Sequence, residues 1–277
     1  TKFIDKMKST FFPDGVPSHV QANSLPYSTH FRDRIIDALV YDCVNPPYPE
    51  LVKPFQSKLG HVMYLCNSTR CDIVYAVHQL ARCMCKPTPD LVLELDHLLA
   101  YLIRTRTLGL TYSRESSKLE AYSDASWEER NSTSGWVALW QYAAISWGSR
   151  RQQSVALSSC EAEIIALSEA TKDVVYLRRL LTGLDPAYVD GTTDLYTDNQ
   201  GARDTSYNPV NHDRMKHVAR RHYFVRDMVE DFQIRVPFVR TADNIADFFT
   251  KAAKSATAFR AHRKIIMNEP ADPTPGE

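Results

Sequence analysis

The chain has 277 residues, 44% hydrophobic and 10% aromatic, which is enough apolar surface for a core and excludes global disorder. Basic and acidic residues number 33 each, so any attraction to nucleic acid must come from local patches. No apolar run approaches the roughly eighteen residues of a membrane-spanning helix, and the first residues lack a signal-peptide layout. We expect an intracellular protein, cytoplasmic or nuclear. The start at Thr1 suggests a piece of a longer chain.

The cysteines form no C-x-x-C pair, and no second pair completes a zinc site around the closest two. Most lie in the first third of the chain, in apolar and helix-like surroundings. We therefore expect buried free thiols in a reducing compartment. The six are Cys43, Cys66, Cys71, Cys83, Cys85 and Cys160.

Residues 1–115 predict a mainly helical domain. A short helix is expected over Phe3–Phe12, followed by proline-rich segments that end at Pro54. Between residues 56 and 112, apolar residues recur at the spacing of helices. The three stripes are Leu59, Val62, Met63 and Cys66; Ile73, Val77, Leu80 and Met84; and Leu91, Leu95, Leu98 and Leu102.

Residues 116–253 predict an α/β domain. Short β-like runs and helical stretches alternate in the order βββ-α-β-α-β-α, which is typical of a mixed sheet flanked by helices. The long helix Ser159–Leu181 is expected to end at Gly183. Residues 254–277 then predict a C-terminal helix and a loose, proline-rich tail. The expected strands are Leu119–Ser123, Gly135–Leu139, Ala143–Trp147, Leu195–Thr197 and Gln233–Val239, and the later helices are Met215–Val229 and a segment from Asn244.

Two aspartates follow predicted strands: Asp124 ends the first strand and Asp198 ends the fourth. A single aspartate after a strand is usually a turn or cap residue. If the first and fourth strands are neighbours, however, both carboxylates lie at the carboxyl ends of adjacent strands and share one crevice. Crowded carboxylates repel, so such a pair requires a cation.

The long helix offers two glutamates, and the helical period separates their roles. Glu163 is in line with the apolar stripe Leu167, Ala170, Val174, Leu177 and Leu181, and so faces the sheet. A charge on that stripe is costly unless it is paired or binds a metal. Glu161 points elsewhere and completes the capping box Ser158-x-x-Glu161. We therefore choose Glu163 as the functional acid.

Near the end of the domain the choice is between Asp243 and Asp247. Asp243 directly precedes the predicted helix and is well placed as its N-cap. Asp247 lies about one turn into that helix beside apolar residues. We prefer Asp247 as the fourth acid. Three or four converging carboxylates without a His or Cys set favour Mg²⁺ or Mn²⁺, and a pair of such ions about 4 Å apart suits phosphodiester hydrolysis.

The segment between residues 214 and 226 contains five basic residues and no acidic one, which predicts a local positive face in a neutral chain. Such a face can follow the phosphates of nucleic acid, although an ordinary solvated helix has the same pattern. A second small basic patch precedes the long helix. The candidate nucleic-acid-binding residues are Arg214, Lys216, Arg220, Arg221 and Arg226, with Arg150 and Arg151 in the second patch.

These motifs together resemble the ribonuclease H domain of copia-type LTR retrotransposon Pol polyproteins, over residues 119–267 and in the same order. The resemblance implies an RNase H-like five-stranded sheet that cuts the RNA strand of RNA–DNA hybrids with two Mg²⁺ ions. It places the metal-binding, catalytic acids at Asp124, Glu163, Asp198 and Asp247. The motifs are Tyr122–Trp127, Ser132–Trp136, Ala144–Trp147, Val155–Ala170, Tyr196–Gln200, Lys216–Val218 and Ala246–Lys251.

The first part resembles the end of the reverse transcriptase in the same polyproteins, comparable to a thumb and connection. The motifs are Phe55–Leu65, Thr69–Val77 and Gly109–Tyr112. No Asp-Asp dipeptide occurs, so the metal-binding motif of a polymerase is missing from this chain. The resemblance implies upstream polymerase domains as partners. The alternative is a decayed remnant that binds nucleic acid without cutting it.

Overall fold

In the computed structural model the chain divides into two units, residues 1–110 with 252–261, and residues 111–251 with 262–277. The structure describes residues 2–18, 20, 24–114, 118–127, 132–207 and 219–270. The chain passes from the first unit to the second near residue 110, and residues 252–261 belong again to the first. The C-terminal helix α9, Ala256–Met267, begins in that returning segment.

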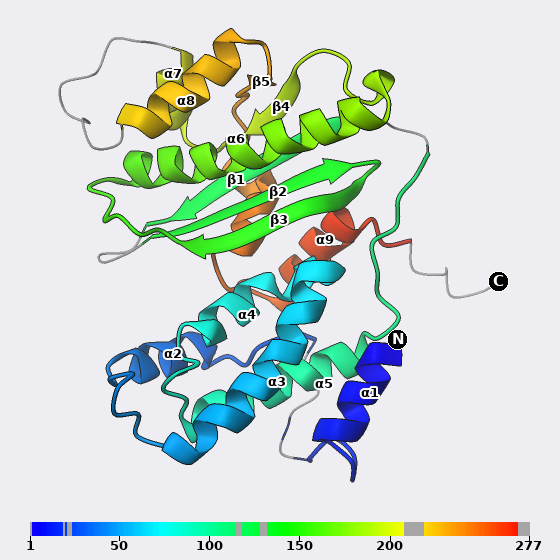
Figure 1. The fold of residues 1–277 in the computed structure, drawn as a ribbon, viewed down its shortest axis with the longest axis vertical. Coiled ribbons are helices and arrows are strands. Elements are labelled where there is room, and N and C mark those ends of the chain that lie inside the picture. Colours follow the sequence, from blue (N-terminus) through cyan, green and yellow to red (C-terminus); the bar gives the residue numbers. More distant parts are fainter. Residues whose placement is uncertain are drawn as a thin grey trace. The chain divides into compact units, whose positions relative to one another are not determined.

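The first unit is helical in its described residues, and the predicted stripes form its core. Leu59, Val62, Leu80, Leu95 and Leu98 are all fully buried. The returning segment joins this core, because Ala253 N donates to Tyr27 Oη at 2.7 Å. The helices are α1 (Lys2–Phe11), α2 (Phe31–Leu39), α3 (Pro49–Ser68), η1 (Cys71–Ile73), α4 (Val74–Ala81) and α5 (Pro89–Arg104) (Figure 1).

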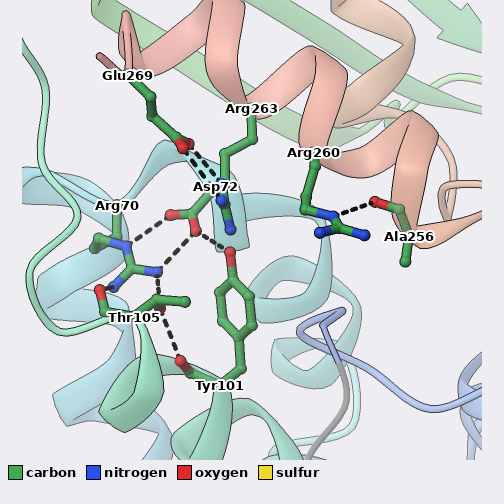
Figure 2. A network of polar contacts seen from close by, with 8 residues as sticks. All are labelled: Arg70, Asp72, Tyr101, Thr105, Ala256, Arg260, Arg263 and Glu269. Atoms are coloured by element: carbon green, nitrogen blue, oxygen red, sulfur yellow. Dashed lines mark hydrogen bonds and ion pairs between the residues drawn. The ribbon is translucent and has the colours of Figure 1, made fainter. Parts of the chain in front are cut away.

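A buried ion pair ties the start of η1 to the end of α5 (Figure 2). Arg70 donates through Nε and Nη2 to the two carboxylate oxygens of Asp72, each at 2.8 Å. Tyr101 Oη donates to Asp72 Oδ2 at 2.6 Å, and Arg70 Nη2 donates to Thr105 Oγ1 at 2.7 Å. Arg70 is only 1% exposed, so its charge depends on these partners.

The second unit is built on a mixed five-stranded sheet in the order β3-β2-β1-β4-β5. The first three strands are antiparallel neighbours, whereas β4 is parallel to β1 and β5 is parallel to β4. This confirms the predicted mixed sheet flanked by helices and the pairing of the first and fourth strands. The strands are β1 (Leu119–Ser126), β2 (Thr133–Trp140), β3 (Ala143–Arg151), β4 (Thr193–Tyr196) and β5 (Ile234–Arg235).

Helix α6, Ser159–Leu184, crosses one face of this sheet (Figure 1). Its predicted stripe, Leu167 to Leu181, packs on Leu119, Ala121 and Leu195 of the sheet in one buried cluster. The other helices are η2 (Pro186–Tyr188), α7 (Gln200–Tyr207), α8 (Ala219–Glu230), η3 (Thr241–Asp243) and η4 (Ile245–Phe249). No helix in the described part of the chain is long and apolar enough to cross a membrane.

Several boundaries differ from the predictions. Pro54 lies inside α3 rather than in a break, since the buried Phe55 and Leu59 that follow it hold the helix against the core. Gly183 does not end α6, which continues to Leu184 with Asp185 at the C-cap. Helix α7 was not predicted, because its residues are polar and carry no clear apolar stripe.

The cysteine prediction is correct for the bonding state and wrong in part for burial. All six are free thiols. Cys66, Cys71 and Cys83 are buried, as expected, whereas Cys43 and Cys85 are exposed and Cys160 is half-buried. The two exposed thiols lie in irregular segments beyond helix ends, where no apolar stripe carries them into the core.

The buried Arg70–Asp72 pair predicts that replacing Asp72 destabilises the protein far more than replacing an exposed aspartate of the same unit. Replacing Asp72 by Ala leaves the Arg70 charge buried without its carboxylate, and we expect the free energy of unfolding to fall by about 3–5 kcal/mol. Asp5→Ala is the control, because Asp5 forms an exposed ion pair with Arg106 and such pairs contribute about 0–1 kcal/mol. Urea unfolding of both variants measures the difference; equal losses would contradict the structural role of the pair.

Candidate metal centre

Three carboxylates meet at the carboxyl edge of the sheet. Strands β1 and β4 are parallel neighbours, with Tyr122 opposite Tyr196. Asp124 and Asp198 follow these two residues at the same spacing and therefore reach the same edge. Glu163 comes from the second turn of α6. One carboxylate oxygen of each of the three lies within 4.8 Å of those of the other two.

The two glutamates of α6 have the different surroundings that the helical period predicted. Glu161 N donates to the N-cap Ser158 Oγ at 3.2 Å, and Leu157 N donates to Glu161 Oε2 at 2.8 Å. The side chain of Glu161 thus accepts a backbone hydrogen bond at the start of α6. Glu163 is 6% exposed and faces the other two acids. Among the described residues no donor reaches its Oε2, which is buried.

Asp247 lies beside the three acids but outside the 4.8 Å group. It is on η4, and its Oδ1 is 2.6 Å from Lys251 Nζ. The prediction that Asp243 caps this helix is wrong: Asn244 is the N-cap, and its side chain accepts from Ala246 N at 3.1 Å. Asp243 pairs with Arg240 at 2.7 Å. The amide of Asn244 also donates to the sheet, which a carboxylate at this position would be unable to do.

The segment from Asn244 to Lys251 is clamped onto the sheet next to the acids. Asn244 is fully buried, and its Nδ2 donates to Ser123 O at 3.0 Å. Thr250 Oγ1 donates to Asp124 Oδ2 in a short hydrogen bond. Gly135, which faces Asp124 across the β1–β2 ladder, permits this approach. A Cβ at Gly135 would lie 2.6 Å from Thr250 Cγ2 and 2.9 Å from Phe249 Cβ.

Burial and mutual repulsion govern the protonation of the centre. Burial raises the pKa of the Asp124 carboxyl to about 6, and the nearby charges of Asp247 and Asp198 add to this. Lys251 and the hydrogen bond from Thr250 act in the opposite direction. Burial, followed by the charges of Asp124 and Asp198, raises the pKa of Glu163 well above its ordinary value. The ionised forms of these acids are therefore destabilised, and a bound cation would stabilise them.

The donor set fits a hard divalent cation. It contains carboxylate oxygens without a sulfur or imidazole ligand in the group, the combination that Mg²⁺ and Mn²⁺ prefer. The buried Oε2 of Glu163 is an acceptor without a hydrogen-bond donor among the described residues. A ligand bond to a metal would satisfy that atom.

Part of the predicted basic face gathers around a groove of about 260 Å³. Arg150 and Arg151 come from the end of β3, and Arg221 comes from α8. The Nη1 of Arg221 donates to Ser154 Oγ at 3.4 Å. Lys172 of α6 adds a charge that the sequence analysis did not include. The groove is lined by Ser134, Arg150, Arg151, Gln152, Gln153, Ile165, Glu169, Lys172 and Arg221.

The remaining members of the predicted face are not brought to the groove. Arg226 pairs with Glu230 at 3.2 Å and stacks on the Tyr223 ring, 5.1 Å from its centroid. Arg214 and Lys216 lie outside the described residues, and so does the side chain of Arg220. The groove and the acids share one edge of the sheet, because β3 ends and β1 ends at that edge.

Comparison with known proteins places this chain in a family. Over 211 residues, 74% of the chain, it is 36% identical to the retrovirus-related Pol polyprotein from transposon RE1 of Arabidopsis thaliana. Similar identities link it to polyproteins of the same kind from a second Arabidopsis transposon and from tobacco. The chain belongs to the copia-type Pol polyproteins. It spans 14% of the length of the RE1 polyprotein.

Two further likenesses concern single regions of this Pol chain. It is 43% identical over 129 residues to secreted RxLR effector protein 161 of Plasmopara viticola, covering 45% of the chain and 91% of that protein. RNase H1 of Halobacterium salinarum matches 48% of the chain and 93% of its own, with 17% identity and a TM-score of 0.37. No protein-family model matches the chain. The five-stranded mixed sheet flanked by helices agrees with the fold that the resemblance implied.

Sequence reasoning missed four residues that hold the centre together: Gly135, Asn244, Thr250 and Lys251. All four lie inside motifs that were noticed or next to one, but nothing in their spacing shows that they meet Asp124 across the sheet. A signal did exist for Asn244, since asparagine is as good an N-cap as aspartate. The roles of the other three can be recognised only in the folded structure, where residue 250 lies against residue 135.

The raised pKa of Asp124 predicts that the protein loses stability as the pH rises. In EDTA, folding favours the protonated carboxyl, so its contribution is present below the unfolded value near 4 and lost as the pH rises through about 6. Asp124→Asn mimics the protonated form. We expect the wild type to lose about 2–3 kcal/mol relative to this variant over that window.

Urea unfolding at several pH values in EDTA measures this difference, with Asp243→Asn as an exposed control. A wild type that gains stability relative to Asp124→Asn as the pH rises would contradict the arrangement of charges described above.

Proposed function

We propose that residues 116–253 form a ribonuclease H, a metal-dependent endonuclease that cuts the RNA strand of RNA–DNA hybrids. The observation that carries this proposal is the meeting of Asp124, Glu163 and Asp198 within 4.8 Å at one edge of an RNase H-like sheet. The relationship to copia-type Pol polyproteins supports it. The carboxylate donor set and the buried acceptor of Glu163 suit the binding of divalent cations, as a two-metal hydrolase uses them.

Each acid has a role that follows from its position. Asp124 and Asp198, from adjacent strands, would share two Mg²⁺ or Mn²⁺ ions, whereas Glu163 and Asp247 would each complete one site. The bound ions would activate a water molecule and stabilise the leaving oxygen of the phosphodiester. The hydrogen bond from Thr250 orients the carboxylate of Asp124, and the α6 stripe holds Glu163 toward the sheet.

The basic groove would bind the hybrid by its phosphates. Arg150, Arg151, Lys172 and Arg221 line it with Glu169 as the one acid among its lining residues. Because the chain as a whole is neutral, this local excess of positive charge is the feature that can follow a polyanion. Upstream polymerase domains of the parent polyprotein would be the other partner, since the chain spans a small share of its relatives.

Separate replacement of the two glutamates of α6 distinguishes a catalytic role for Glu163 from a capping role for Glu161. Glu163→Gln keeps the shape and removes the charge, so folding should survive while the rate of hybrid cleavage falls on the order of 10²–10³-fold. Glu161→Ala removes the side-chain acceptor of Leu157 N and keeps the backbone N–H that donates to Ser158 Oγ. It should cost about 0.5–2 kcal/mol of stability and keep most of the activity per folded molecule.

Cleavage of an RNA–DNA hybrid with a labelled RNA strand, with Mg²⁺ and with EDTA, and the melting temperatures of both variants make this comparison. Asp247→Asn should reduce the rate less than Glu163→Gln does. Absence of cleavage by wild-type protein that still binds the hybrid would favour a decayed binding module. Normal cutting by Glu163→Gln would exclude the proposed metal centre.

The groove predicts the salt dependence of hybrid binding. Each phosphate neutralised makes the slope of log K against log salt more negative by about 0.9 on B-DNA, a value that serves as an approximation for a hybrid. Replacing Arg151 and Arg221 by Ala should therefore flatten the slope by about one to two. Fluorescence anisotropy in EDTA measures it without cleavage.

The control removes two charges elsewhere, from Arg179 on α6 and Arg203 on α7, which do not line the groove. If the control and the groove variant flatten the slope equally, the hybrid does not bind preferentially in the groove.

A further inference from the structure

A lysine of the chain occupies the space between the acids of the centre. Lys251 Nζ lies 2.6 Å from Asp247 Oδ1 and 3.7 Å from Asp124 Oδ2. Its charge also acts on Glu163 and Asp198. The lysine is thus the counter-charge for the same carboxylates that would hold a divalent cation.

The backbone fixes Lys251 in this place. Lys251 N donates to Asp247 O at 3.2 Å, so the lysine sits one turn after the aspartate it pairs with. The preceding residue, Thr250, donates to Asp124, and the close contact with Gly135 holds this turn on the sheet. The side chain is nevertheless 47% exposed. It can therefore move to solvent, which would remove its charge from the buried carboxylate of Asp124.

We propose that Lys251 is a built-in counter-ion of the centre, which holds the acids together before a metal binds and competes with a divalent cation for Asp124 and Asp247. This inference rests on the proposed metal-dependent function. A cation that takes Asp247 as a ligand must displace the ammonium group from it. Lys251 therefore sets the metal affinity of the centre, as a positioning residue and not as a ligand.

Two opposite effects of removing the charge follow. In EDTA, Lys251→Gln leaves the acids to repel one another, so its melting temperature should fall below that of the wild type. Toward Mg²⁺ or Mn²⁺, the variant lacks the competing charge and should bind about three- to tenfold more tightly, a modest factor because the ammonium is half exposed to solvent. A residue with a merely structural role would lower both stability and metal affinity.

Isothermal titration of the full chain with MnCl₂ and MgCl₂, without nucleic acid, measures the affinity. Lys251→Arg keeps the charge and should bind within about twofold of the wild type. Lys254→Gln removes an equally charged, exposed side chain three residues on and should change neither affinity nor melting temperature. If Lys251→Gln is unfolded in EDTA, its melting temperature as a function of Mn²⁺ concentration yields the same affinity.

The outcomes separate this inference from the proposed function. Tighter binding by Lys251→Gln, together with a lower melting temperature in EDTA, supports the competing counter-ion. Equal or weaker binding by the variant, with a wild type that binds Mn²⁺, overturns the inference and leaves the metal centre in place. Failure of the wild type and of every variant to bind either ion overturns both.

Discussion

Repulsion among buried carboxylates is the constraint on which the second unit depends. Parallel pairing of β1 and β4 carries Asp124 and Asp198 to one edge of the sheet, and α6 adds Glu163 from above. Burial makes each negative charge costly, as the raised pKa values of Asp124 and Glu163 show. Protonation, a nearby lysine or a bound cation lowers this cost.

The segment after β5 resolves this conflict and depends on an unusually close approach to the sheet. Asn244 hydrogen-bonds to β1, Thr250 hydrogen-bonds to Asp124, and Lys251 adds a positive charge. All three require that residues 246–250 pass over Gly135, where a side chain would collide with them. One glycine on β2 is thus linked to the electrostatics of a site to which it contributes no polar side chain.

The distribution of charge in this neutral protein is the basis of the proposed binding of a polyanion. Acids are drawn into the centre, while arginines from β3 and α8 gather around a neighbouring groove at the same edge of the sheet. The groove and the acids thus present opposite charges at the same edge of the sheet. A nucleic acid held by the groove would bring a phosphodiester toward the carboxylates, which on their own would repel it.

Local patterns in the sequence determined much of this protein: the stripe that turns Glu163 toward the sheet, the capping position of Glu161, and two aspartates near the carboxyl ends of strands. These features depend on the side-chain periods of strands and helices, two and 3.6 residues, which can be read from the sequence before the fold is known. A strand was predicted over Gln233–Val239, but its restriction to the two residues of β5, the end of α6 at Leu184 and the choice of Asn244 over Asp243 as a cap were decided in the tertiary structure. So were the grouping of Arg150, Arg151 and Arg221, and the place of Lys251 among the acids. These features join residues that are far apart in sequence, and the energy of such contacts exists only once the sheet has brought their partners together.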